Sequence, residues 1–213
     1  MKAFNSFVIG LVLLFAGWNL IQMVFIYGKA EVAQILLEKA WQRTLLNHTV
    51  EGHNHDSELE RPWAWSDSSP IAKLIFPDQD KELIVLNNGT GRSMAFAPSH
   101  LAGSAEFGNN GVTVIGGHKD THFDFLEHTL IKDDFWVQLP NGEFKPYRVT
   151  GIQVADVTSS ELLLEADHSV IVLVACYPFS TLVSGGDLRY LVIAEPYVTQ
   201  LGPFQGASNL IAL

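Results

Sequence analysis

The only cysteine of the chain, Cys176, is the first candidate for covalent chemistry. It ends the apolar run SVIVLVAC and is followed by Tyr177 and Pro178, which cannot continue a central strand. We therefore expect the thiol at the end of a buried strand, where a rigid scaffold presents catalytic groups to a loop. The alternative is that a cysteine after five aliphatic residues is a small residue of the core.

A histidine in a loop that begins with glycines is the candidate partner of this thiol. His118 follows the predicted strand GVTVIGG and opens the polar segment HKDTHF. The two glycines permit close backbone approach, so the imidazole can project into a groove. A nearby base or imidazolium makes a thiol nucleophilic at neutral pH, even when the partners are distant in sequence. The alternative is a histidine with a structural role.

An arginine on the last predicted strand completes the set. Arg189 lies in the segment GGDLRYLVIAEP. Consecutive strands joined by a loop pair antiparallel, so Cys176 and Arg189 come together if both side chains point to the same face. A guanidinium beside a cysteine favours the thiolate or donates to the oxyanion of an acyl transfer. The alternative is a surface charge on an edge strand.

Short β-rich runs after Pro70 must position these side chains. Asn141-Gly142 predicts a hairpin, and residues 87–89 are a second turn candidate. Residues 123–130 and 159–164 are candidates for short helical turns. The pattern indicates a β-barrel or sandwich and not alternating β/α units. Seven runs are predicted as strands: IAKLIF, KELIVL, GVTVIGG, DFWVQL, KPYRVTGIQVADV, HSVIVLVAC and LRYLVIAEP.

An uncharged run at residues 7–27, FVIGLVLLFAGWNLIQMVFIY, predicts a transmembrane helix. About 20 apolar residues are needed to cross hydrocarbon about 30 Å thick. A signal peptide would have a shorter apolar core and a small-residue cleavage site, and the remaining alternative is a buried core helix. The charges beside the run differ little between its two ends. The simplest topology places the N-terminus in the cytoplasm and the body of the chain outside.

Three parts of the chain follow from these patterns. Residues 1–28 are the membrane anchor, residues 29–69 are a juxtamembrane helix and polar linker, and residues 70–213 are the β domain that carries the three candidate residues. Within the second part, residues 29–46 are rich in strong helix formers. The linker that follows is polar and acidic, with three histidines.

Composition excludes several other classes of protein. The chain has 213 residues, of which 47% are hydrophobic, so disorder across its whole length is excluded. It has 13 Lys and Arg against 23 Asp and Glu, with no basic cluster, which argues against nucleic-acid binding. One cysteine allows neither an internal disulfide nor a multi-cysteine metal site. We expect no cofactor and no metal.

Together these features resemble the sortases, the cysteine transpeptidases of bacterial surfaces. The resemblance covers residues 70–196, with the N-terminal anchor in the expected place, and depends on the segments GGHKDTHF, DFLEHTLIKDD, LVACYPF and LRYLVIAEP. Cys-Tyr-Pro-Phe and the GGDLRY spacing are most similar to the Gram-negative branch, often called class GN. The cysteine signature departs from the family pattern: sortases usually carry Thr-Leu-x-Thr-Cys, whereas the same positions read Val172-Leu173-Val174-Ala175-Cys176 here. Ala175, directly before the nucleophile, lacks a hydroxyl that could orient substrate or stabilise an oxyanion.

The resemblance implies a mainly β fold, a closed sortase-type β-barrel with short helices, preceded by the transmembrane helix. It implies a transpeptidase that cleaves an LPxTG-like C-terminal sorting signal, a reaction whose first half is shared with peptide-bond hydrolysis by an endopeptidase. Cys176 would form a thioacyl intermediate. His118 would protonate the leaving amine and deprotonate the incoming one, and Arg189 would hold the substrate carbonyl or the oxyanion.

The same resemblance implies the partners and the location. The partners are a membrane-bound protein substrate with a C-terminal sorting signal and an amine acceptor. The N-terminal helix would cross the bacterial inner membrane once, with the catalytic domain on the periplasmic side.

Two other functions stay open. A metal-dependent hydrolase would use His118 and His122, which are four residues apart, as ligands. Further potential ligands are Asp120, Asp124 and the linker residues His53, His55 and Asp56. A non-enzymatic membrane-anchored β domain is the second alternative, and it predicts that Cys176 reacts with a mild alkylating agent no faster than a free thiol does.

Overall fold

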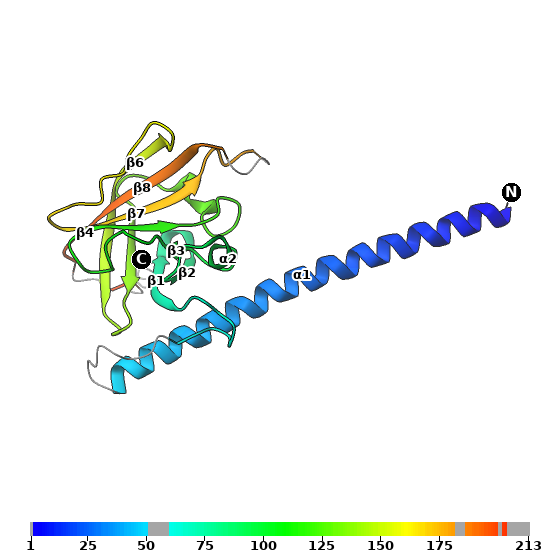
Figure 1. The fold of residues 1–213 in the computed structure, drawn as a ribbon, viewed down its shortest axis with the longest axis horizontal. Coiled ribbons are helices and arrows are strands. Elements are labelled where there is room, and N and C mark those ends of the chain that lie inside the picture. Colours follow the sequence, from blue (N-terminus) through cyan, green and yellow to red (C-terminus); the bar gives the residue numbers. More distant parts are fainter. Residues whose placement is uncertain (1, 51–59, 182–185, 200–201, 204–213) are drawn as a thin grey trace, which may run out of the picture. The chain divides into compact units, whose positions relative to one another are not determined.

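The computed structural model describes residues 2–50, 60–181, 186–199 and 202–203. Eight strands in this part of the chain close into a barrel in the order β1-β2-β3-β4-β7-β8-β6-β5 (Figure 1). The strands are β1 (Pro70–Phe76), β2 (Lys81–Leu86), β3 (Ser99–His100), β4 (Gly111–Gly116), β5 (Asp134–Gln138), β6 (Phe144–Asp156), β7 (Ser169–Cys176) and β8 (Leu188–Pro196). The helices are α1 (Lys2–Val50) and α2 (Gly91–Met94), with short 3-10 turns η1 (Pro77–Gln79) and η2 (Asp124–His128).

All seven predicted strands are present. The strand that the sequence did not predict is β3, which pairs with β2 and β4 through only two residues, Ser99 and His100. The candidate helical turn at 123–130 contains η2, whereas residues 159–164 form no helix. The mainly β barrel with short helices is therefore confirmed.

The hairpin between β5 and β6 turns at Asn141-Gly142, as predicted. Gly142 has φ +83°, a left-handed conformation that glycine adopts without steric cost. The Leu139 N–H donates to the carbonyl of Glu143 over 2.9 Å, and the Asn141 side chain accepts from the Glu143 N–H over 3.0 Å. These bonds set the antiparallel register of the two strands.

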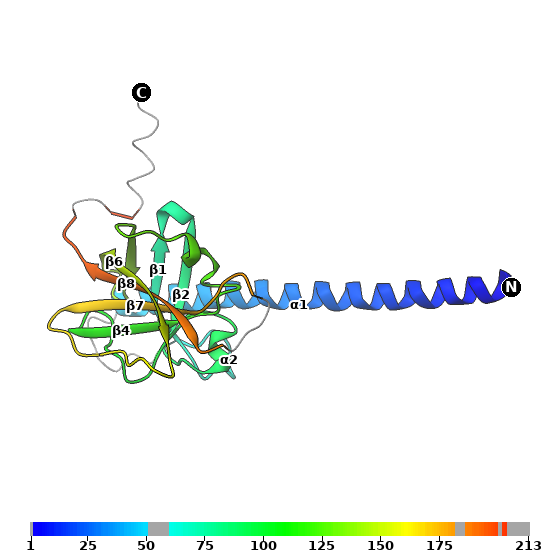
Figure 2. The same ribbon diagram turned by 90° about the horizontal axis from the view of Figure 1, so that it is seen from above.

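Two layers of apolar side chains hold the sheet, one on each of its faces. Inside the barrel, the main core includes stacked rings of Phe76, Phe135 and Tyr147, with centroid distances of 4.8 and 5.8 Å. On the outer face of β4, β7 and β8, a second layer packs beneath Leu101 and Ala166, and we call it the outer cluster. Figure 2 shows these three strands side by side. The outer cluster consists of Val112, Val114, Val170 and Val172, with Leu101, Ala166, Val174, Leu191 and Ile193 packed against it.

The chain divides into two compact units between Leu36 and Leu37. In the second unit, the last turns of α1 pack on the barrel through Leu37 and Trp41, which are fully buried. The Trp41 indole N–H donates to the Gln138 side chain over 3.1 Å. The helix predicted at 29–46 is confirmed, and its C-terminal part shares an apolar cluster with Ile84, Leu86 and Ala97.

The N-terminal part of α1 has the composition of a membrane-spanning segment. The helical stretch Ile9–His48 contains a window that is long and apolar enough to cross a bilayer, and no residue of that window is buried in the structure. It overlaps residues 7–27, for which the sequence predicted a transmembrane helix. This helix is therefore a candidate membrane anchor on grounds of length and composition.

Candidate active site

Parallel pairing of β4 with β7 brings the segments that carry His118 and Cys176 to the same end of the barrel. Gly116 of β4 pairs with Val174 of β7, and the Gly117 N–H donates to the Val174 carbonyl over 3.0 Å. His118 and Cys176 each lie two residues beyond the Gly116 and Val174 pair. The exposed histidine and the half-buried cysteine therefore follow neighbouring strand ends at the same level.

The strand β8 flanks β7 on its other side and supplies Arg189. The two strands pair antiparallel, with Cys176 directly opposite Arg189. The Tyr177 N–H donates to the Leu188 carbonyl over 3.0 Å, which extends this pairing past the cysteine. Cys176 thus lies on the middle one of three adjacent strands, with His118 after one neighbour and Arg189 on the other.

Cys176 and Arg189 project from the same face of the sheet. Along β7, Ile171, Leu173 and Ala175 belong to the main core, whereas Val170, Val172 and Val174 lie in the outer cluster. Side chains alternate between the two faces of a strand, so Cys176 follows Val174 onto the outer face. On β8, Leu191 and Ile193 pack against the outer cluster, and by the same alternation Arg189 shares their face.

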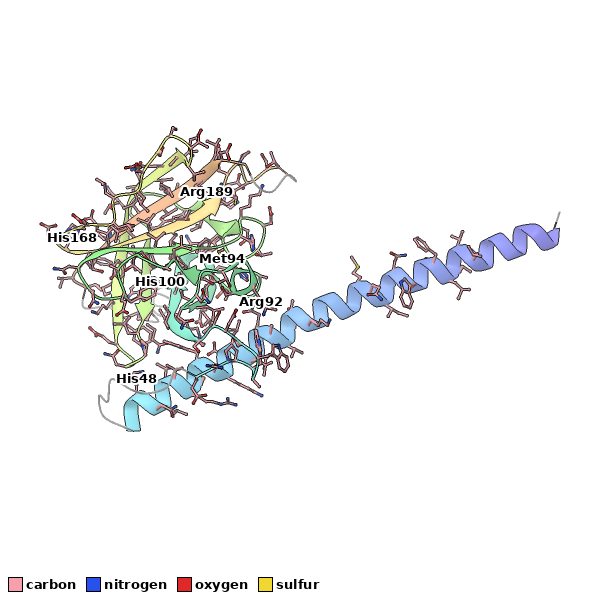
Figure 3. The ribbon with its side chains drawn as sticks, viewed as in Figure 1. His48, Arg92, Met94, His100, His168 and Arg189 are labelled. Carbon is pink, nitrogen blue, oxygen red and sulfur yellow. The ribbon has the colours of Figure 1, made fainter. Side chains whose placement is uncertain are left out.

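The guanidinium of Arg189 bonds to backbone carbonyls at the start of its own strand and in the loop before it. Figure 3 labels Arg189 on β8. Its Nη1 donates to the carbonyls of Gly186, over 2.5 Å, and of Leu188, over 2.9 Å. These contacts orient a fixed positive charge on the strand next to the thiol. Guanidinium N–H groups have a planar fork geometry suited to an oxyanion or a carbonyl oxygen.

Ala175 lies on the opposite side of the sheet from Cys176. Its side chain is 1% exposed and belongs to the main core, where it is paired with Tyr190 of β8. A hydroxyl at this position would point into the barrel. The alanine at position 175 therefore removes a polar group from the core face. The other departure from the Thr-Leu-x-Thr-Cys pattern, Val172, lies in the outer cluster on the face that carries the thiol.

An aromatic group packs beside the cysteine at the end of the barrel. Tyr177 stacks on Tyr190 with a centroid distance of 6.0 Å, and Phe179 meets Tyr190 edge-on at 5.2 Å. Burial raises the pKa of Tyr190, and the charges of Tyr177 and Glu127 raise it further. This aromatic group was not predicted from the sequence, although Tyr-Pro-Phe directly follows Cys176.

A second histidine lies near His118. The ring of His122 is hydrogen-bonded to the Ala95 backbone, and its Nε2 is buried without a hydrogen-bond partner among the described residues. Burial lowers the pKa of His122, and the charge of His118 lowers it further. The neutral form of His122 is therefore favoured at neutral pH.

The metal-site hypothesis gains no support from the described ranges. In the part of the chain that the structure describes, no group of three or more His, Cys, Asp or Glu side chains is arranged to hold a metal ion. The segment from His118 to His122 is a turn and not a helix, so the four-residue spacing does not place both rings on one helical face. The linker residues His53, His55 and Asp56 lie outside the described residues.

Gly117 sets the position of the backbone that enters the histidine turn. A β-carbon at Gly117 would lie 2.6 Å from the ring of Phe123, which is fully buried in the main core. The Phe123 N–H donates to the His118 carbonyl over 3.0 Å and closes the turn. Glycine at position 117 therefore allows the chain to pass directly over this ring.

We predict that Gly117→Ala destabilises the folded protein by about 1–3 kcal/mol, because the added methyl overpacks the core against Phe123. Urea unfolding of the full chain measures this change. Gly91→Ala is the matched control, because a β-carbon at Gly91 meets no atom within 4 Å. Equal unfolding midpoints for the two variants would contradict the prediction.

Comparison with known proteins agrees with this geometry. A family model described as the sortase domain matches residues 74–197. Sortase D of Bacillus subtilis is 25% identical over 123 residues, which span 57% of this chain and 61% of that protein. The structure of a Clostridium perfringens Sortase D5 transpeptidase aligns with a TM-score of 0.60 at 17% identity, over 79% of this chain and 99% of that chain. Sortase A from Corynebacterium diphtheriae aligns with a TM-score of 0.58 at 23% identity, over 83% of this chain and 88% of that chain.

The chain belongs to the sortase family, because the family model covers more than half of its length and all strands from β2 to β8. The structural likenesses show that it has the barrel of that family.

Proposed function

We propose that this protein is a membrane-anchored cysteine transpeptidase that acts on a C-terminal sorting signal. The observation that carries the proposal is the arrangement of three adjacent strands. Cys176 ends the middle strand, His118 follows the parallel neighbour in matching register, and Arg189 is directly opposite the cysteine. Membership of the sortase family supports the same chemistry.

In the proposed first half-reaction, the Sγ of Cys176 attacks the carbonyl carbon of the scissile peptide bond and forms a tetrahedral oxyanion. Arg189 stabilises this oxyanion. When the C–N bond breaks, the His118 imidazolium transfers a proton to the leaving amine, and a thioacyl enzyme remains. In the second half, His118 takes a proton from the incoming amine, which attacks the thioester and releases the thiolate.

The proposed substrate carries an LPxTG-like signal, and the proposed acceptor is an amine. The Cys176-Tyr177-Pro178-Phe179 sequence and the GGDLRY spacing support an enzyme of the Gram-negative branch. We propose that the apolar helix anchors it in the inner membrane in a single pass, with residues 70–213 as a catalytic domain on the periplasmic side. A substrate held by its own membrane segment would then meet the enzyme at a raised effective concentration.

Arg189→Lys is predicted to lower kcat/KM for a sorting peptide by about 10²-fold, because lysine keeps the charge but lacks the planar fork that holds an oxyanion. Arg148→Lys is the matched control. It replaces an arginine that pairs bidentately with Asp134, at 2.6 and 2.7 Å, on strands β6 and β5. We expect that control to keep its turnover. An Arg189→Lys variant within twofold of the parent would contradict the proposed role.

The proposed function is tested with the full chain in detergent micelles, a fluorescent LPxTG peptide and an amine acceptor. Formation of an amide-linked transfer product, unchanged by a strong chelator, is the expected result. Cleavage that gives only the free carboxylic acid and stops in the chelator would favour a metal-dependent hydrolase. A second outcome would favour a non-enzymatic β domain: no cleavage of any peptide in a sorting-signal library, with Cys176 alkylated no faster than a free thiol.

A further inference from the structure

A buried lysine directly after the candidate histidine has no role in the chemistry proposed above. Lys119 is only 4% exposed. Lysine is almost never fully buried unless its charge is compensated, because transfer of an ammonium group out of water is costly. The partners of its Nζ atom should therefore reveal why the chain keeps a charge at this position.

The partners all come from the segment that follows Cys176. The Nζ of Lys119 donates to the carbonyl of Pro178 over 2.7 Å, to the carbonyl of Thr181 over 2.6 Å and to the hydroxyl of Thr181 over 3.1 Å. An ammonium group has three donors, and these three acceptors match them. The carboxylate of Asp120 is 4.0 Å away and largely exposed, so it adds a weaker, solvent-screened attraction.

These hydrogen bonds connect the segments that follow β4 and β7, beyond the backbone hydrogen bonds that pair the two strands. Among the described residues, the backbone bond from Gly117, directly after β4, to Val174 of β7 is the last one between these two segments. The side chain of Lys119, the residue after His118, then bonds to Pro178, which is two residues after Cys176. Hydrogen bonds from a charged donor are shorter and about twice as strong as neutral ones, so this link is stiff.

We propose that Lys119 is a positioning residue that sets the separation of His118 and Cys176. The proposal depends on the roles assigned to those two residues under the proposed function. Loss of the ammonium group would remove the hydrogen bonds that hold the Pro178 and Thr181 carbonyls against Lys119 and free the segment after the cysteine. A displacement of about 1 Å at a catalytic pair costs about 10²-fold in rate.

The test compares Lys119→Met with Lys73→Met in the full chain. Lys73 is also largely buried, with its Nζ 2.7 Å from Glu82 and 3.2 Å from Glu38, but it lies on β1. Burial acts to lower the pKa of Lys73, and the two carboxylates outweigh it, so its pKa is raised. Both substitutions remove a paired buried charge, so both should reduce stability. Only Lys119→Met should alter the active site.

Two readouts separate positioning from stability. We expect Lys119→Met to lower kcat/KM by about 10- to 100-fold. We also expect the pH at which iodoacetamide alkylates Cys176 at half its maximal rate to rise by about 0.5 to 1 unit, because a more distant imidazolium stabilises the thiolate less. Lys119→Arg keeps a charged donor, so it should restore part of the lost kcat/KM and part of the shift in the alkylation profile. Lys73→Met should match the parent in the alkylation profile.

A Lys119→Met profile that coincides with that of the parent would overturn the positioning role. If Lys119→Met does not fold, the Thr181→Val variant tests the positioning role instead, because it keeps the ammonium group and removes one of its acceptors. A rise in the pH of half-maximal alkylation, smaller than that expected for Lys119→Met, supports the proposal. An unchanged alkylation profile overturns it. Alkylation of Cys176 needs no peptide substrate, so its pH profile can be measured whether or not the proposed function is correct. A parent enzyme that never forms an acyl adduct would refute the proposed function, and the alkylation test of Lys119 would still apply.

Discussion

Replacement of Cys176 by alanine is expected to abolish both cleavage of the sorting peptide and formation of a covalent adduct, a loss of about 10⁴-fold or more. Cys176 is the only cysteine in the chain, so no second thiol can take over the attack. The measurement is the release of the leaving peptide from a labelled substrate, followed over hours. The Cys176→Ala variant should show a background rate equal to that of buffer.

The same variant should fold normally. Cys176 is half-buried at the end of β7, and the core residues before it are unchanged by the substitution. Urea unfolding should therefore give a free energy within about 1 kcal/mol of the parent. Full transpeptidation by folded Cys176→Ala would refute the proposed mechanism.

His118→Gln is expected to lower kcat by about 10²- to 10⁴-fold, the range for loss of a general acid and base. In the proposed mechanism this histidine donates a proton to the leaving amine and removes one from the incoming amine, so both half-reactions suffer. The pH dependence of kcat/KM should also lose the limb that reports the imidazole. Stopped-flow measurement of peptide cleavage between pH 5 and 9 tests both expectations.

His168→Gln is the matched control for this variant. His168 directly precedes β7, at the end of the strand opposite to Cys176, and is partly exposed beside Asp167 (Figure 3). Along the strand it lies about 26 Å from the cysteine. The His168→Gln variant should keep the kcat of the parent and the pH dependence of its kcat/KM. Equal losses in the two variants would show that the effect of His118→Gln is not specific to the site.

Local patterns were sufficient to predict most of the fold. Short β-rich runs and turn residues predicted seven strands and the Asn141-Gly142 hairpin, because these features are encoded within a few neighbouring residues. The two residues of β3, Ser99 and His100, carry no local strand pattern. They are extended because β2 and β4 pair with them, which depends on the closed barrel.

Packing between distant segments was harder to predict. The sequence predicted a helix at 29–46 from its composition. It did not predict that Leu37 and Trp41 are buried in a cluster with β2 residues, because an apolar helical face does not identify its partner. The indole N–H of Trp41 and the side chain of Gln138, 97 positions apart, show how non-local this contact is.

In the candidate site, too, the features marked by local sequence were predicted and those that depend on distant segments were not. Cys176, His118 and Arg189 were predicted because each lies at a strand end that local sequence marks. The parallel register of β4 and β7, which brings two of them to one level, is a property of the barrel. Lys119 was missed, because a lysine in a polar loop is normally a solvated surface charge. Its burial depends on carbonyls from the segment after the cysteine.

The nucleophilic role of Cys176 is tested by the intact mass of the full chain after incubation with sorting-signal peptides. We expect a mass increase equal to the acyl part of the cleaved peptide, mapped to Cys176 and removed by hydroxylamine, as expected for a thioester. The increase should be absent from the Cys176→Ala variant. An acyl adduct on any other residue, or cleavage of the peptide with no dependence on Cys176, would show that Cys176 is not the nucleophile.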